Sequence, residues 1–167
     1  MKQIKKILGS VPSHITYVPI DFDTQTLDEA LGSKGLDTAK TTFFIWEGVM
    51  QYIAAEAVDS TLKYISKTSP GSRIVFTYVL KSVIDGTSNL EDAASLMTKM
   101  VKTAKAPWIF GLEPINIKEF LRHYNLSLIE DIGASYYQEN YLKPIGRDLK
   151  VSEVERITLA QVINGNH

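Results

Sequence analysis

The sequence predicts an α/β fold built on a mostly parallel sheet with an antiparallel edge. Strand-like and helix-like segments alternate along the 167 residues, and no repeat or Pro/Gly-rich linker divides them. The stretch from 41 to 79 predicts a strand, a helix and a second strand, joined by a connection long enough for a right-handed parallel crossover. Two strand-like segments near the end of the chain are expected to pair antiparallel. We therefore expect residues 1–167 to form a single domain.

The elements of the first part follow from local patterns. Residues 2–8 predict a short helix, and His14 to Ile20 (HITYVPI) predict a strand because β-branched and aromatic residues dominate the segment. Thr26 and Glu29 have the spacing of a capping box, which predicts a helix running to about Leu31.

Apolar periodicity then predicts the parallel unit. Thr41 to Trp46 is a nearly continuous apolar run, typical of a strand covered on both faces. Ala55 to Ser66 has apolar residues at helical spacing and is followed by the helix-breaking pair Pro70-Gly71. Ser72 to Val79 alternates as the next strand.

The second half predicts helices over residues 89–104, 116–124 and 136–142, and strands over 126–134 and 155–163. Asn116 is placed to cap the second of these helices, since Glu119 follows three residues later. An aromatic loop, Pro107 to Pro114, precedes this cap.

Composition excludes several classes of function. A net charge of −1 gives no basic surface for nucleic acid, and the absence of cysteine excludes disulfides and thiolate chemistry. The three histidines lack metal-ligand spacing, and no apolar run reaches the length of a membrane span. The sequence also contains no G-x-S-x-G, Walker or G-x-G-x-x-G motif. We expect a cytoplasmic protein that binds no metal, nucleic acid or membrane.

Two acids follow predicted strands, where open α/β sheets bind their ligands. Asp21 follows the segment at 14–20, and Glu47 follows the strand at 41–46 and precedes Gly48. Each carboxylate could accept hydrogen bonds from a ligand. Alternatively, each could cap the helix after it, since acids are favoured at helix N-termini.

Four stretches of the sequence resemble the leucine carboxyl methyltransferase family, particularly its bacterial branch of small-molecule (polyketide-type) O-methyltransferases. The "EG" block inside the second stretch is the most specific part of the likeness. The stretches are Tyr17–Phe22 (YVPIDF), Thr41–Ile53 (TTFFIWEGVMQYI), Pro70–Tyr78 (PGSRIVFTY) and Pro107–Pro114 (PWIFGLEP).

The resemblance implies a Rossmann-like fold that uses S-adenosylmethionine to methylate a carboxylate or hydroxyl of a small molecule or peptide. By match to the family motifs, Asp21 and Phe22 would contact the adenine of the cofactor. Glu47 and Gly48 would lie at its methionine end.

The same resemblance suggests that Tyr52, Trp108 and Phe110 line the pocket of a small-molecule acceptor. Packing of these three aromatic side chains into a core or an interface is the alternative. Methyl transfer needs few acid–base groups, because it depends mainly on holding donor and acceptor together in a dry site.

The sequence also departs from the family. Family members are longer and begin with a strand, a glycine-rich turn and a second strand whose terminal acid holds the ribose. None of these occurs here, so the resemblance implies the C-terminal part of the fold, truncated by its first two strands. In the family's sheet these strands lie between the strand at 15–20 and the strand at 42–46. We therefore expect a homo-oligomer, with a self-associated dimer as our hypothesis, or a partner supplying the missing strands.

Three functional hypotheses remain open on the sequence. The chain could be a methyltransferase module that is active when its N-terminal half is supplied. It could be a catalytically inactive remnant that serves as an oligomeric or partner-binding protein. It could also be another α/β domain with a chance likeness. Binding of the cofactor separates the first hypothesis from the other two.

Overall fold

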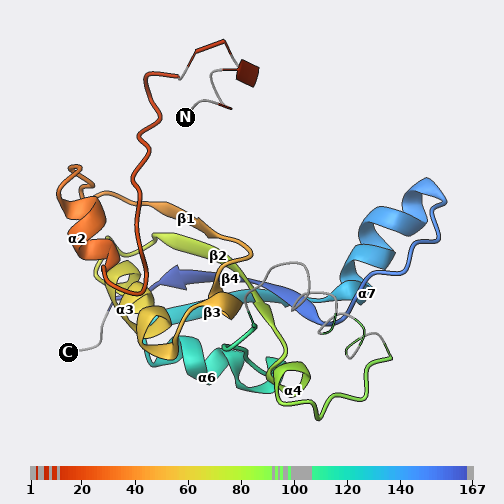
Figure 1. The fold of residues 1–167 in the computed structure, drawn as a ribbon. Helices are drawn as coiled ribbons and strands as arrows, with labels where there is room; N and C mark the ends of the chain where they lie inside the picture. The colour runs from red at the N-terminus through yellow and green to blue at the C-terminus, as the bar shows by residue number, and fades with distance from the viewer. Residues whose placement is uncertain are drawn as a thin grey trace.

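The computed structural model describes residues 3, 6, 7, 9, 10, 12–91, 93, 95, 98 and 107–164. In this part of the chain, four strands form one sheet in the order β1-β2-β4-β3 (Figure 1). β1 and β2 run parallel, whereas β4 is antiparallel to both β2 and β3. The sheet is therefore mixed, and it contains both the predicted parallel unit and the predicted antiparallel edge. The strands are β1 (Phe43–Trp46), β2 (Arg73–Val79), β3 (Leu126–Ile132) and β4 (Glu155–Val162).

The main core lies between one face of this sheet and a layer of helices. Helix α3 (Ala55–Ser66) has the predicted bounds, and α6 (Ile117–Arg122) lies beside it (Figure 1). Because side chains alternate along a strand, every second residue of β2 and β4 points into this core. The buried side chains include Val58, Leu62 and Ile65 from α3, Leu121 from α6, and Ile74, Phe76, Tyr78, Ala160 and Val162 from the sheet.

Shorter elements surround this core. Helix α2 (Leu27–Gly32) begins with the predicted capping box, in which Thr26 accepts from the Glu29 backbone and the Glu29 side chain accepts from the Thr26 backbone. The other helices are α4 (Lys81–Ile84) and α7 (Ala134–Tyr137), which continues into a π-helical turn (Gln138–Leu142). Short 3₁₀ turns cover Met50–Tyr52, Pro114–Asn116 and Lys143–Ile145.

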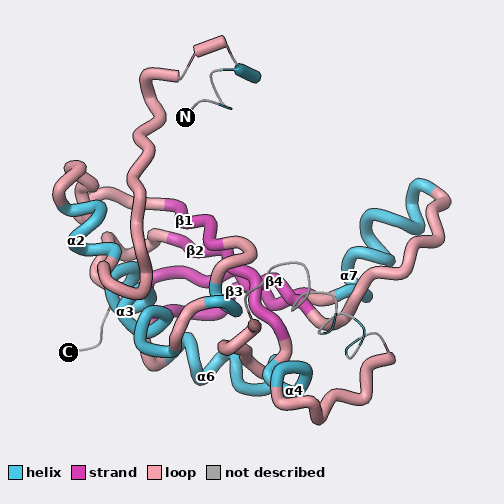
Figure 2. The backbone as a smooth tube through the Cα atoms, in the orientation of Figure 1, coloured by secondary structure: helices cyan, strands magenta, loops and turns pink. Residues whose placement is uncertain are grey.

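The strand predicted at His14–Ile20 is wrong. Residues 15–20 form irregular extended chain that rises away from the sheet in Figure 2. Ile15 is 39% exposed and Tyr17 is 42% exposed, so neither side chain is packed as in a covered strand. β-propensity reflects packing against neighbouring strands, and no described strand lies beside this segment.

Other local predictions have mixed outcomes. Asn116 precedes α6, but its side chain makes no capping hydrogen bond, and the 3₁₀ turn before it begins the helix instead. The helices predicted over 2–8 and 89–104 lie largely outside the described residues. No helix within the described ranges is long and apolar enough to cross a membrane.

Candidate active site

The turn after β1 presents Glu47 at the carboxyl end of the parallel strand pair. Gly48 has φ 67°, a left-handed conformation that glycine adopts without strain. Its backbone N–H donates to Thr77 Oγ1 at 2.9 Å, which ties the turn to β2. Thr77 is buried, whereas Glu47 is exposed. Glu47 thus lies just beyond the carboxyl end of β1, the kind of sheet edge at which open α/β sheets bind ligands.

Glu47 is not the cap of the helix that follows it. The 3₁₀ turn at Met50–Tyr52 begins at Val49 without a side-chain capping bond. Helix α3 has Ala54 as its N-cap residue, also without a side-chain capping bond. The capping role that the sequence offered for Glu47 is therefore not adopted.

The aromatic loop at 107–112 is bonded to the same edge of the sheet. The backbone carbonyl of Gln51 accepts from the N–H groups of Ile109, at 2.8 Å, and Phe110, at 3.3 Å. The Leu112 N–H donates to the Val79 carbonyl at 3.1 Å, just where β2 ends. The segments that follow β1 and β2 are therefore joined through this loop.

The predicted acceptor residues divide between two apolar clusters. Trp108 is buried in a small cluster with Val79, and Tyr52 packs against it half-buried. Phe110 packs instead against the main core, where its ring centroid lies 6.5 Å from that of Phe120. Tyr52 and Trp108 thus belong to the same small cluster, whereas Phe110 packs against the main core.

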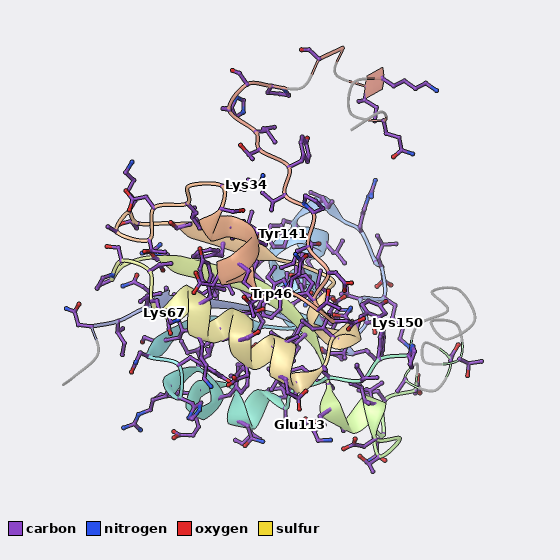
Figure 3. All side chains as sticks on the ribbon, turned by 60° about the vertical axis from the view of Figure 1, so that its left-hand side comes forward. Lys34, Trp46, Lys67, Glu113, Tyr141 and Lys150 are labelled. Carbon is purple, nitrogen blue, oxygen red and sulfur yellow. The ribbon has the colours of Figure 1, made fainter. Side chains whose placement is uncertain are left out.

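Three buried polar atoms near these residues have no hydrogen-bond partner within the described part of the chain. They are Trp46 Nε1, Gln51 Oε1 and Trp108 Nε1. Figure 3 shows Trp46 in the interior of the molecule, behind α3. Buried polar groups are usually hydrogen-bonded, and those that are not mark sites of strain or of ligand contact. Gln51 was missed by sequence reasoning, although it lies inside the "EG" block between Glu47 and Tyr52.

Asp21 and Phe22 have different roles in their loop. The Asp21 side chain accepts from the Asp23 N–H at 3.0 Å, and the Asp21 carbonyl accepts from Gln25 at 2.8 Å, so Asp21 closes a turn. Phe22 packs half-buried against the main core. Phe22 also lines a surface pocket of about 500 Å³ between this loop and the first turn of α3.

Helix α7 carries Tyr137, whose hydroxyl is affected by several nearby groups. Burial raises the pKa of the Tyr137 hydroxyl, and the nearby charges of Glu155 and Glu47 raise it further. Tyr137 therefore stays protonated at neutral pH and can donate a hydrogen bond. No local pattern in the sequence indicated that residue 137 would lie close to residue 47.

A polar network on the core face of the sheet holds β2, β3 and β4 together. Asp131 accepts from Arg156 Nη2 at 2.7 Å, from Thr158 Oγ1 at 2.8 Å and from the Tyr78 hydroxyl at 3.2 Å. Burial and the Asp131 carboxylate raise the pKa of Tyr78, so its hydroxyl remains a donor. All four polar groups are partnered within the network, which indicates a structural role.

The described residues contain no group of three or more His, Asp and Glu side chains that could hold a metal ion. Asp21 and Asp23 are joined by a backbone-to-side-chain bond within one turn and have no third acid beside them in the described chain.

The fold and this edge of the sheet define the class of protein: an α/β, Rossmann-like fold of the methyltransferase type. The structure superimposes with a TM-score of 0.57 on a DUF574 family protein from Streptomyces avermitilis, at 13% identity, covering 96% of this chain and 60% of that one. It also superimposes with a TM-score of 0.54, at 13% identity, on a structure of the Haloferax volcanii Trm112 methyltransferase activator complexed with a methyltransferase, covering 96% and 67%.

Sequence comparison supports the resemblance to a methyltransferase family. The model of the leucine carboxyl methyltransferase family matches residues 1–66. YktD of Bacillus subtilis (strain 168), whose name describes an S-adenosyl-L-methionine-dependent methyltransferase, is 33% identical over 127 residues. The match covers 74% of this chain and 40% of YktD, so the chain spans less than half the length of this relative. Both matches support the resemblance of this chain to the leucine carboxyl methyltransferase family.

Proposed function

We propose that this chain is a module of an S-adenosylmethionine-dependent methyltransferase that methylates an oxygen of a small molecule or peptide. The observation that carries the proposal is the exposed Glu47 carboxylate, held by the Gly48–Thr77 bond at the carboxyl end of β1 and not used as a helix cap. The resemblance to the family and the name of the B. subtilis relative support the same cofactor.

The predicted site residues of this chain suit the methionine end and the adenine of S-adenosylmethionine. Glu47 can accept hydrogen bonds from the ammonium group at the methionine end, and the lack of a Cβ at Gly48 lets a ligand approach the backbone closely. Phe22 offers an aromatic wall beside the pocket at α3, which suits adenine. The ribose has no counterpart among the predicted site residues. We infer that polypeptide outside this chain completes the cofactor site.

When bound, S-adenosylmethionine supplies an electrophilic methyl group, whose bond to sulfur breaks as its bond to the acceptor oxygen forms. The chain's own residues orient the reactants and exclude water. Tyr52 and Trp108 pack together next to the bonded loop at 107–112, and we propose that they and Phe110 flank the acceptor. Such positioning accounts for much of the rate of a two-substrate transfer.

We further propose that the working protein is a homo-oligomer or a complex with a partner that supplies the missing strands, and that it acts in the cytoplasm. The Haloferax structure, in which a methyltransferase is complexed with an activator, supports the second arrangement. The competing hypothesis of a catalytically inactive remnant predicts that no form of the chain binds the cofactor.

Isothermal titration with S-adenosylhomocysteine tests the proposal. One sample is the chain alone, and the other is a fusion in which the unmatched part of YktD precedes this chain. We expect Glu47→Ala to weaken binding at least tenfold, because an ammonium group would lose a charge-assisted hydrogen bond of about 2 kcal/mol. Glu119→Ala is the matched control, since Glu119 is an exposed acid on α6. Equal affinities of the two variants, or no binding by the fused chain, would refute the proposed role.

A further inference from the structure

A surface pocket of about 400 Å³ lies at the carboxyl end of β3, where α7 leaves the sheet (Figure 1). Cavities of this volume can hold a small organic molecule. The wall of the pocket combines two members of the Asp131 network with side chains of α7 and the turn after it. It includes Asp131, Gly133, Tyr136, Glu139 and Arg156.

Arg156 has one nitrogen atom left to bind a ligand in this pocket. Its Nε and Nη2 atoms donate to Asp131 Oδ2 at 2.9 and 2.7 Å, and Nη2 also donates to the Asp131 backbone carbonyl at 3.3 Å. Nη1 has no hydrogen-bond partner among the described residues. Because the guanidinium group is planar, its bonds to Asp131 also fix the direction of the two free N–H groups on Nη1.

Gly133 leaves the space beside this nitrogen. Its φ of −124° is open to any residue, so backbone conformation does not require a glycine here. A Cβ at Gly133 would lie 2.4 Å from Arg156 Nη1 and 2.8 Å from Glu153 Oε2. The free nitrogen and the Glu153 carboxylate therefore lie close to the same point in space.

The charges around Nη1 favour a neutral oxygen atom over an anion as its partner. Arg156 is already paired with Asp131, and Glu139 is paired with Lys143. Glu153 forms no ion pair within the described part of the chain, so its charge is not offset. An anion bound at Nη1 would face this carboxylate, and like charges placed close together repel each other. A carbonyl oxygen can accept from Nη1 without that repulsion.

We propose that this pocket binds a neutral carbonyl compound, such as an amide or a ketone, whose oxygen accepts from Arg156 Nη1 and whose body lies against the ring of Tyr136. Tyr136 is half-buried, and its ring is held by an edge-to-face contact with Tyr137 at 6.3 Å between centroids. β1 and β3 are three strand spacings apart in the sheet, roughly 14 Å, so the pocket is separate from the edge that carries Glu47. The inference therefore goes beyond the proposed methyl transfer.

Two probes that share a phenyl ring test the chemistry of the pocket. Benzamide presents a neutral carbonyl group, and benzoate presents a carboxylate. Each probe is titrated into the isotope-labelled chain without cofactor, and NMR follows the backbone amides of residues 131–140 and the Arg156 Nε–H. We expect benzamide to shift these resonances with a dissociation constant in the millimolar range, as suits so small a ligand, and benzoate to bind about tenfold more weakly.

Arg156→Lys keeps a cation beside Asp131 but removes Nη1. It should therefore weaken benzamide binding about tenfold, the effect of losing one hydrogen bond from a charged donor. Arg122→Lys is the matched control, because Arg122 is an exposed arginine at the end of α6, which precedes the amino end of β3. The dispersion of the NMR spectrum shows whether each variant folds.

Glu153→Gln keeps the test decisive if Arg156→Lys does not fold. Glutamine retains an oxygen that can accept from the Ala134 N–H, as Glu153 Oε2 does at 3.2 Å, but it carries no charge. Benzoate should then bind about tenfold more tightly than to the unchanged chain and approach the affinity of benzamide. Loss of structure cannot produce such a gain in binding.

Four results would overturn the inference. The first is that neither probe shifts the resonances of residues 131–140. The second is benzoate binding to the unchanged chain as tightly as benzamide. The third is equal benzamide binding by folded Arg156→Lys and Arg122→Lys variants, and the fourth is benzoate binding that Glu153→Gln leaves unchanged. Because no cofactor is present, these outcomes are independent of the S-adenosylhomocysteine titration that tests the enzymatic function.

Discussion

Asp131 joins three side chains that are far apart in the sequence. It binds Arg156 and Thr158 of β4 and Tyr78 of β2 while belonging itself to β3. The Arg156 and Asp131 side chains are 19% and 10% exposed, so water could replace a lost partner only in part. Breaking a buried charge pair is far more damaging than breaking an exposed one.

We therefore expect Asp131→Ala to lower the free energy of unfolding by about 2–4 kcal/mol, because the half-buried Arg156 would lose its carboxylate and the buried Tyr78 and Thr158 hydroxyls would lose their acceptor. Glu119→Ala, which removes an exposed ion pair with Arg122, should change it by about 0–1 kcal/mol. Urea denaturation measures both values. Equal losses would show that the Asp131 network adds no more than a surface pair.

Tyr124 gives the fold a defined sensitivity to alkaline pH. Its hydroxyl donates to Asp59 Oδ1 at 3.2 Å, and burial together with the Asp59 charge raises the pKa of Tyr124 to about 12 from 10. The protonated tyrosine is favoured in the folded state. Its contribution to stability is therefore complete below pH 10 and is lost as the pH rises toward 12.

Between these two pH values, the unfolding free energy should fall by up to about 1.4 kcal/mol per pH unit for this one group. Tyr124→Phe should have a shallower slope over the same range, even if it is less stable at pH 8. The Tyr124→Phe variant should keep part of the dependence of unfolding free energy on pH, because the pKa of Tyr78 is also raised. Denaturant titrations at several pH values give the slopes, and identical slopes would contradict the assignment to Tyr124.

At the scale of elements, the backbone of the aromatic loop lies very close to the backbone at the end of β2. The closest approach is at Gly111. A Cβ at this position would lie 2.8 Å from Ile84 Cδ1 and 2.9 Å from the Val79 carbonyl oxygen. Those distances are too short for a real side chain. The loop that carries Trp108 and Phe110 can therefore reach β2 only because residue 111 has no side chain.

Gly111→Ala should lower the unfolding free energy by about 1–3 kcal/mol through overpacking, and it should displace the loop from Val79. Gly32→Ala is the control. A Cβ there would come no closer than 3.8 Å to Asp28 Oδ1, so stability should be unchanged or rise by up to about 1 kcal/mol. Thermal or urea unfolding compares the two, and a neutral Gly111→Ala would show that the loop can move aside freely.

The elements also show which local signals sufficed for prediction. The capping box at Thr26 formed as predicted, and the bounds of α3 follow directly from its apolar periodicity. The segment at 14–20 has equally good local signals but forms no strand, because a strand needs a neighbour to take its backbone hydrogen bonds. Asn116 failed as a cap because Pro114 begins a 3₁₀ turn ahead of it.

At the scale of the whole molecule, β2 connects the two apolar clusters. Its residues Phe76 and Tyr78 pack in the main core, and Val79 packs in the small cluster with Trp108. The sequence has two tryptophans, and Trp46 belongs to the main core. Since one strand contributes to both clusters, we expect them to unfold together.

The single-tryptophan variants Trp46→Phe and Trp108→Phe test this expectation. In each variant, the fluorescence of the remaining tryptophan should change at the same urea concentration as the far-ultraviolet circular dichroism, as two-state unfolding requires. Each substitution should lower stability by about 1–3 kcal/mol. A Trp108 signal that changes at lower urea than the circular dichroism would show that the small cluster opens independently.

The sequence by itself determined what depends on neighbours along the chain: the α/β pattern, the helix at 55–66, the strand, helix and strand segments from 41 to 79, and the likeness to a methyltransferase family in the "EG" block. Only the tertiary structure decided the features that depend on contacts between residues far apart in the sequence. It joined Gln51 to the aromatic loop, left Glu47 outside any helix cap, and left Phe43 and Ile45 exposed on one face of the sheet. The physical reason is that helix periodicity and caps are local interactions, whereas strand pairing, burial and close backbone approach require partners that the linear sequence does not identify.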